Sequence, residues 1–126
     1  MKKDGLIRIL VVDDEWDLME GAMSFAHVMN PSYQFYKTKT IDDGLNLLLT
    51  LNPDIVFLDK NFADSNKSGT YFLDVIQNTA VYKDYREIPI VGIGSFYDDE
   101  LHKLTEYDPK PLSYKNFEDM IKKYVK

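Results

Sequence analysis

The chain has 126 residues, a length that fits one domain built around a single hydrophobic core. Acidic residues outnumber basic ones by 21 to 15, which gives a formal net charge of −6. We therefore expect no binding to nucleic acid or to an anionic membrane, because phosphate contacts need a basic patch. The absence of cysteine excludes disulfides, thiolate catalysis and cysteine-ligated zinc. No apolar stretch is long enough for a membrane span or a signal peptide, so we expect a soluble, cytoplasmic protein.

Apolar runs alternate with helix-periodic segments in the first half of the chain. Residues 6–12 are almost continuously apolar, as expected of a parallel strand that is covered on both faces. A helix is predicted over residues 16–29, with an apolar stripe formed by Leu18, Ala22, Phe25 and Met29. Residues 33–37 are more polar and predict a short strand at the edge of a sheet.

The next helix has a clear start and a clear end. Thr40 is a suitable N-cap, since Asp43 stands three residues later, and Asn52-Pro53 ends the helix. Its predicted inward residues are Ile41, Leu45, Leu48 and Leu49. Residues 55–58 form the most apolar strand. A polar loop then leads to a helix carried by Tyr71, Phe72, Val75 and Ile76.

The last third of the chain continues the alternation. A strand is predicted over residues 89–93, a helix of at most about two turns over 98–104, and a strand over 106–109. The last of these is expected from topology rather than from propensity. Ser113 caps a final helix whose inward residues are Phe117, Met120, Ile121, Tyr124 and Val125. Five strands alternating with five helices predict an α/β fold with a doubly wound parallel sheet.

Polar residues stand where the predicted strands end. Asp13 and Asp14 follow the first strand, Asp59 follows the third, and Ser95 and Lys110 come at or just past the last two. Ligands of such sheets bind outside the carboxyl ends of the strands, where the strand order reverses. Carboxylates that meet there repel one another unless a cation joins them, so the pattern implies a divalent metal and a role for the lysine. It predicts a site that handles phosphate.

Simpler roles exist for each of these residues. Asp13 and Asp14 could cap the first helix, whose positive dipole end favours acidic side chains. Asp59 could be a turn residue, and Lys110 could be a solvated surface lysine. Their joint occurrence at strand ends favours the site.

The chain resembles the receiver domain of two-component response regulators over essentially its whole length. The matching segments are Val11-Val12-Asp13-Asp14-Glu15, Phe57-Leu58-Asp59, Ile88-Pro89-Ile90-Val91, and Tyr107 three residues before Lys110-Pro111. The resemblance implies the flavodoxin-like strand order 2-1-3-4-5. It also leads us to expect a single receiver domain over residues 1–126, without an output domain.

The resemblance further implies a chemistry. Asp59 would take a phosphoryl group from the phosphohistidine of a sensor histidine kinase or phosphotransfer protein. Mg²⁺ would be held by Asp14 and Asp59, with the backbone carbonyl of Asn61, and by Asp13 through water. Lys110 would neutralise charge on the transferred phosphoryl oxygens. The chain would signal by binding an unidentified output protein, and would be no enzyme beyond its own phosphorylation and dephosphorylation.

Two departures from the family pattern matter. The family usually has Thr or Ser at the end of the fourth strand, where Gly94 stands here and Ser95 follows. We predict that a one-residue bulge lets Ser95 bind the phosphoryl group, since a slip of one residue reverses side-chain direction. The segment over residues 95–110 is also shorter than usual, which predicts a shortened fourth helix. Both departures leave open an alternative, a degenerate receiver that acts as a phosphorylation-independent interaction module.

A small phosphatase of the haloacid-dehalogenase kind is a third hypothesis. That chemistry uses an aspartate nucleophile after the first strand and a second acid two residues later, a pattern that Asp13 and Glu15 half satisfy. The chain has no room for a cap domain, and Asp59 would be left without a role. The receiver is therefore the preferred hypothesis.

Overall fold

The computed structural model describes residues 5–59, 62, 68–93, 106–108 and 113–125. The strands are Ile7–Val12 (β1), Tyr33–Thr38 (β2), Ile55–Asp59 (β3), Ile90–Ile93 (β4) and Glu106–Asp108 (β5). The α-helices within the described residues are Glu20–Met29 (α1), Ile41–Leu51 (α2), Gly69–Asn78 (α3) and Tyr114–Tyr124 (α4). Two 3₁₀ helices are Trp16–Met19 (η1) and Ala80–Tyr85 (η2). No helix in the described ranges is both long and apolar enough to cross a membrane.

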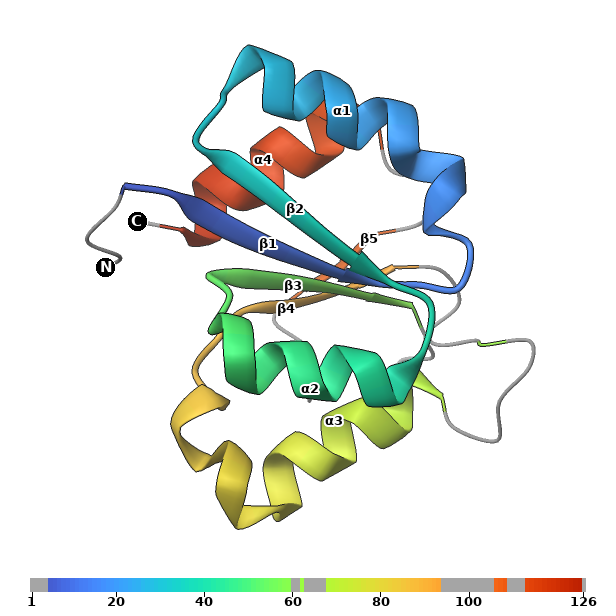
Figure 1. The fold of residues 1–126 in the computed structure, drawn as a ribbon, viewed down its shortest axis with the longest axis vertical. Coiled ribbons are helices and arrows are strands. Elements are labelled where there is room, and N and C mark those ends of the chain that lie inside the picture. The colour runs from blue at the N-terminus through green and yellow to red at the C-terminus, as the bar shows by residue number, and fades with distance from the viewer. Residues whose placement is uncertain (1–4, 60–61, 63–67, 94–105, 109–112, 126) are drawn as a thin grey trace.

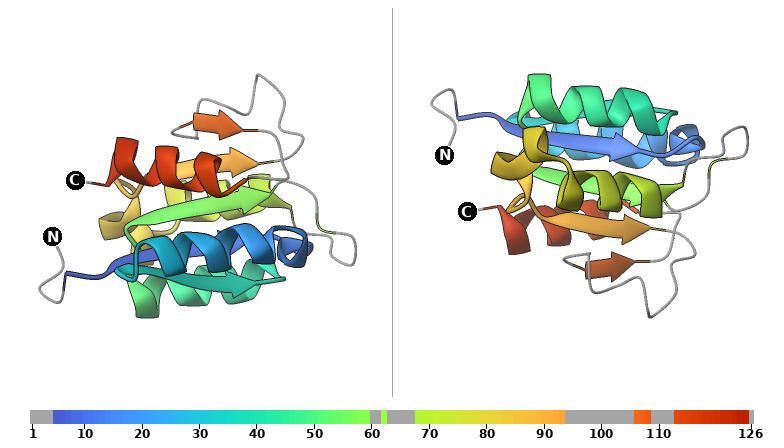
Figure 2. Two further views of the ribbon diagram at one scale, coloured as in Figure 1. Left: turned by 90° about the horizontal axis from the view of Figure 1, so that it is seen from above. Right: turned by 90° about the horizontal axis from the view of Figure 1, so that it is seen from below.

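The five strands form one parallel sheet in the order β2-β1-β3-β4-β5 (Figures 1 and 2). This confirms the predicted strand order, including the short β5. The chain moves from β1 outward to β2 and then crosses to β3 on the other side of β1. The strand order therefore reverses between β1 and β3, and the carboxyl ends of these two strands flank the switch point. The helix predicted over residues 98–104 lies outside the described residues.

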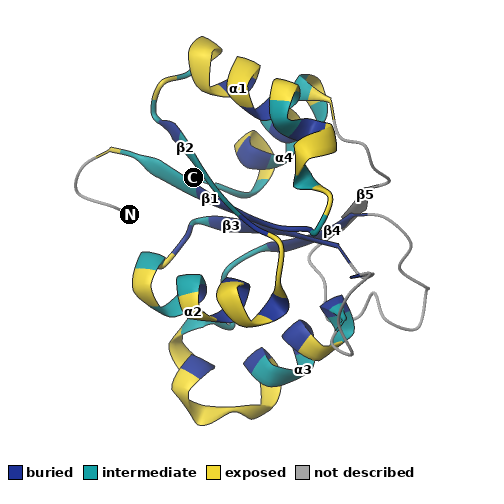
Figure 3. Ribbon diagram, turned by 45° about the vertical axis from the view of Figure 1, so that its right-hand side comes forward, coloured by how far each residue is buried: buried dark blue, intermediate teal, exposed yellow. Residues whose placement is uncertain are grey.

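Helices cover both faces of the sheet. Helices α1 and α4 lie on one face, and α2 and α3 lie on the other (Figure 1). The central strands β1 and β3 are buried between these layers, as the dark ribbons in Figure 3 show. Burial on both faces explains why their sequences are continuous apolar runs rather than alternating ones.

Helix α2 agrees with the prediction from sequence. The Thr40 hydroxyl accepts a hydrogen bond from the backbone N–H of Asp43 at 3.1 Å, which satisfies one of the free donors of the first turn. Asn52 ends the helix in the left-handed conformation, with φ at 49°. The buried side of the helix carries Ile41, Gly44, Leu45 and Leu48. Leu49, also predicted to face inward, is partly buried.

The first helix differs from the prediction. Residues 16–19 form η1, so that α1 begins only at Glu20. The buried residues of η1 and α1 are Met19, Met23 and Ala26. Three members of the predicted stripe are exposed instead: Leu18 by 65%, Phe25 by 50% and Met29 by 58%. The segment carries two adjacent apolar rows, and periodicity alone cannot tell which of them faces the sheet.

The last helix also begins where the sequence indicates. Ser113 and Asn116 form a reciprocal capping box, in which the serine hydroxyl accepts from the Asn116 backbone and the amide oxygen of Asn116 accepts from the Ser113 backbone. Phe117 and Ile121 are fully buried against the sheet. The predicted inward residues Met120, Tyr124 and Val125 are partly buried.

Candidate functional site

Three carboxylates converge at the carboxyl ends of the two central strands. Asp13 and Asp14 directly follow β1, and Asp59 is the last residue of β3. Because Val12 is in register with Leu58, the residues after them emerge side by side at the switch point. One carboxylate oxygen from each aspartate lies within 4.8 Å of the others. The convergence expected from the sequence is therefore present.

Backbone contacts fix Asp13 at this position. Its N–H donates to the carbonyl of Thr38 at 3.0 Å, which extends the pairing of β1 with β2 by one residue. Its carboxylate accepts a hydrogen bond from the N–H of Glu15 at 2.8 Å, and its carbonyl accepts one from Trp16 at 3.2 Å. The tight turn into η1 thus orients the Asp13 side chain. Asp13 is fully buried, Asp59 is 3% exposed and Asp14 is half-buried.

The donor set fits a hard divalent cation such as Mg²⁺. Buried carboxylates are costly unless their charge is compensated, and oxygen is the ligand atom that Mg²⁺ prefers. Octahedral coordination at about 2.1 Å places ligand oxygens roughly 3 to 4 Å apart, which the spread of these three oxygens allows with small side-chain adjustments. Such an ion would retain further positions for water or for phosphate oxygens.

The other residues predicted for the site, Asn61, Ser95 and Lys110, lie outside the described residues, as does Gly94. The strands that precede them are described. Strand β4 ends at Ile93 and β5 at Asp108, and both are parallel to β3. Their carboxyl ends are therefore at the same edge of the sheet as Asp59.

Trp16 begins η1 two residues after Asp14, and the sequence analysis did not identify its basic neighbours. The ammonium groups of Lys37 and Lys39 lie 4.7 and 5.5 Å from the centre of the Trp16 ring, within cation–π distance. Lys37 also forms an ion pair with Glu20 at 3.0 Å. Only the register of β1 with β2 brings these lysines to Trp16, and the sequence alone does not specify that register.

No family model matches the sequence, and neither does any curated protein. Solved structures do match. A response regulator receiver domain from Methylobacillus flagellatus has a TM-score of 0.75 at 19% identity, over 94% of this chain and 98% of that one. A receiver domain protein from Methanospirillum hungatei has a TM-score of 0.75 at 18% identity, over 94% and 92%. The chemotaxis response regulator CheY4 of Vibrio cholerae has a TM-score of 0.73 at 15% identity, over 95% and 99%.

At these identities the matches concern the fold. They span nearly the whole chain. The resemblance predicted from short sequence segments therefore holds in three dimensions. The chain has the fold of the CheY-like receiver domains of response regulators.

Proposed function

We propose that the chain is a phosphoacceptor receiver of a two-component phosphorelay. The observation that carries the proposal is the meeting of Asp13, Asp14 and Asp59 at the switch point of a receiver fold. Asp13 and Asp59 are buried, and a bound divalent cation would compensate the charge of carboxylates gathered at such a position. Phosphorylation would change the charge on Asp59, and the signal would pass to an output protein through the neighbouring strands β4 and β5.

In this proposal each residue has a definite role. The Asp59 carboxylate attacks the phosphorus of a partner's phosphohistidine, so that an O–P bond forms as the N–P bond breaks and the histidine recovers a proton. Asp13 and Asp14 hold Mg²⁺ together with Asp59 and the carbonyl of Asn61. The bound ion supplies positive charge that makes attack by an anion on a polyanion feasible. Lys110 and Ser95 bind the phosphoryl oxygens.

The exposed side of α1 supports a protein partner. Four large apolar side chains of η1 and α1 are exposed, namely Leu18, Phe25, Val28 and Met29. The Phe25 ring stands edge-on to Tyr114 of α4 at 4.8 Å between ring centres, which continues the apolar surface onto a second helix. Because η1 directly follows the acidic residues, a kinase docked here would be held beside Asp59. Phe25→Ala should therefore slow transfer from a phosphohistidine but not from a small phosphodonor.

Intact-mass measurement tests the phosphoacceptor role. The full chain is incubated with acetyl phosphate, with and without Mg²⁺. We expect a mass increase of one phosphoryl group that requires Mg²⁺ and disappears in Asp59→Asn. The matched control is Asp43→Asn, which removes an exposed acid of α2 outside the cluster and should leave the modification unchanged.

An unmodified wild-type mass, under conditions where a known receiver reacts, would contradict the proposal. The degenerate receiver makes a different prediction, since its partner would bind Asp59→Asn and the wild type equally with or without phosphodonor. Modification that persists in Asp59→Asn would place the acceptor at another residue.

A further inference from the structure

Strand β2 forms one edge of the sheet and, among the described residues, pairs only with β1. The N–H of Ile7 donates to the carbonyl of Ser32 at 2.8 Å. In a parallel ladder the residues of a strand bond alternately to its two sides, so the even-numbered residues of β2 face β1. The peptide groups of Tyr33, Phe35 and Lys37 therefore point away from the sheet. Such a row is a template for another strand.

The first of these outward groups already has a partner from outside the sheet. The Nδ1 atom of His27, on α1, lies 2.7 Å from the carbonyl oxygen of Tyr33. A carbonyl oxygen only accepts, so Nδ1 carries the proton and Nε2 of the neutral ring is an acceptor. His27 thus uses one outward position of the edge. The next two positions, at Phe35 and Lys37, continue the row.

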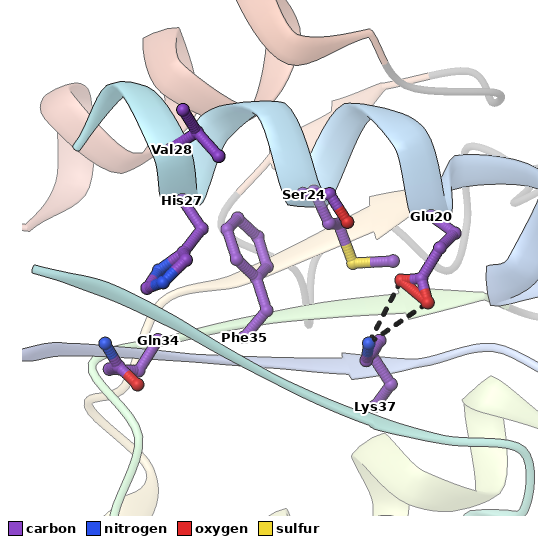
Figure 4. A pocket seen from close by; sticks show the side chains of 8 residues that line it. Glu20, Ser24, His27, Val28, Gln34, Phe35 and Lys37 are labelled. Atoms are coloured by element: carbon purple, nitrogen blue, oxygen red, sulfur yellow. Dashed lines mark hydrogen bonds and ion pairs between the residues drawn. The ribbon is translucent and has the colours of Figure 1, made fainter. Parts of the chain in front are cut away.

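A pocket of about 310 Å³ lies along the same edge, between α1 and β2 (Figure 4). The Phe35 ring stands in its middle. Met23 and Val28 of α1 also line it. His27 and Gln34 lie at one end. The Lys37–Glu20 ion pair lies at the other end, with a distance of 3.0 Å between the charged groups.

We propose that an extended segment of a partner protein adds to β2 as a sixth strand and inserts an aromatic side chain into this pocket. Main-chain hydrogen bonds to Phe35 and Lys37 would supply affinity, and the pocket would supply specificity. The apolar middle of the pocket fits a ring, and the acceptor on His27 favours a ring with a donor at its tip, as in Tyr or Trp. This interaction goes beyond the phosphoacceptor role and does not depend on Asp59.

A second copy of the chain is a poorer occupant of this edge. The side chains of β2 that point toward α1 are Tyr33, Phe35 and Lys37. Tyr33 is buried, and Phe35 packs edge-on to Phe117 at 5.5 Å between ring centres. A β2–β2 pair would therefore bring no side chain that could enter the pocket of the other copy. Two chains of net charge −6 also repel each other.

A phage-displayed library of random linear peptides, selected on the full chain, tests the proposal. We expect enriched sequences with Tyr or Trp among β-branched residues. Lys37→Pro removes the outward N–H without removing a bond to β1, and should lower the affinity for these peptides by at least about tenfold. Lys37→Ala should change that affinity by no more than about threefold. Ser24→Trp, from an exposed position at the pocket, should block binding, and Asn46→Trp on α2 should not.

Amide hydrogen exchange separates strand addition from binding through side chains alone. A selected peptide should slow exchange of the Phe35 and Lys37 amides, also in Asp59→Asn. Unchanged exchange, equal binding to Lys37→Pro and Lys37→Ala, or a library without enriched sequences would each overturn the proposal. So would a concentration-dependent dimer that Lys37→Pro abolishes, because it would assign the edge to a second copy.

Discussion

Helix α1 follows the central strand β1 and helix α2 follows the edge strand β2, and the two helices use their apolar residues differently. Helix α2 places its large apolar side chains against the sheet and the neighbouring helix α3. Helix α1 buries Met23 and Ala26 and exposes Phe25, Val28 and Met29. The two helices are similarly apolar in sequence, so composition does not separate them. The difference is in which apolar residues face the interior.

The contrast indicates that the two helices have different roles. Burial of apolar surface stabilises the fold, whereas apolar surface left in water costs stability unless a partner covers it. The segment η1 that leads into α1 directly follows the acidic residues, and α1 lines the pocket beside β2. No residue of α2 lines that pocket or belongs to the acidic cluster. We therefore expect substitutions in α2 to change stability, and substitutions on the exposed side of α1 to change binding.

The largest predicted effect compares two leucines. Leu48 of α2 is 1% exposed, and Leu48→Ala should lower the free energy of unfolding by about 2 to 5 kcal/mol, since it leaves a cavity in a packed core. Leu18 is 65% exposed, and Leu18→Ala should change the free energy of unfolding by no more than about 0.5 kcal/mol. Chemical denaturation of both variants measures the difference. Similar losses in the two would remove the distinction between α2 and the segment formed by η1 and α1.

Two glycines give the second prediction. A Cβ on Gly44 of α2 would lie 3.0 Å from both γ-methyl groups of Val12 and 3.3 Å from the Phe72 ring. Gly44→Ala should lower the free energy of unfolding by about 1 kcal/mol, because overpacking outweighs the gain in helix propensity. A Cβ on Gly21 of α1 meets no atom within 4 Å, so Gly21→Ala should stabilise by about 0.5 kcal/mol. Thermal unfolding should show opposite shifts, and shifts of the same sign would contradict this account.

The sequence predicted the parts of the molecule that depend on local signals. The Thr40 cap, the Asn52 stop and the continuous apolar run of β3 each identify an element without tertiary information. The approach of Asp13, Asp14 and Asp59 was also predictable, because parallel strands bring their carboxyl ends to one edge of the sheet.

Features that depend on tertiary packing were not predictable. The choice between two adjacent apolar rows on α1 is made by contact with the sheet and with α4, and local periodicity carries no information about it. The approach of Lys37 and Lys39 to Trp16 follows from the register of β2 with β1. The pocket beside β2 depends on the separation between a helix and an edge strand, which no sequence pattern specifies.

The third prediction concerns the helix caps. The Thr40 hydroxyl bonds the Asp43 N–H in α2, whereas the residue before α1, Met19, makes no side-chain cap. Thr40→Ala should therefore cost about 1 kcal/mol of stability, and Thr40→Ser should recover most of it. Equal stability of the alanine and serine variants would mean that the cap contributes little.

The smallest predicted effect concerns Tyr82 of η2, whose hydroxyl contacts the backbone of α2. Its hydroxyl donates to the carbonyl of Leu45 over a long 3.5 Å, so Tyr82→Phe should cost no more than about 0.5 kcal/mol at neutral pH. Burial, with smaller contributions from Tyr71 and Asp42, raises the pKa of Tyr82 above its ordinary 10.0.

This pKa shift gives the tyrosine a pH dependence that phenylalanine lacks. In the folded chain Tyr82 keeps its proton at a pH where the unfolded chain has begun to lose it. The contribution of the tyrosine to stability is thus complete below about pH 10 and is lost as the pH rises through the raised pKa of the folded chain. Denaturation between pH 8 and about 11 should show a shallower loss of stability for Tyr82→Phe than for the wild type. Parallel pH profiles would mean that the hydroxyl is as free to ionise in the folded chain as in the unfolded one.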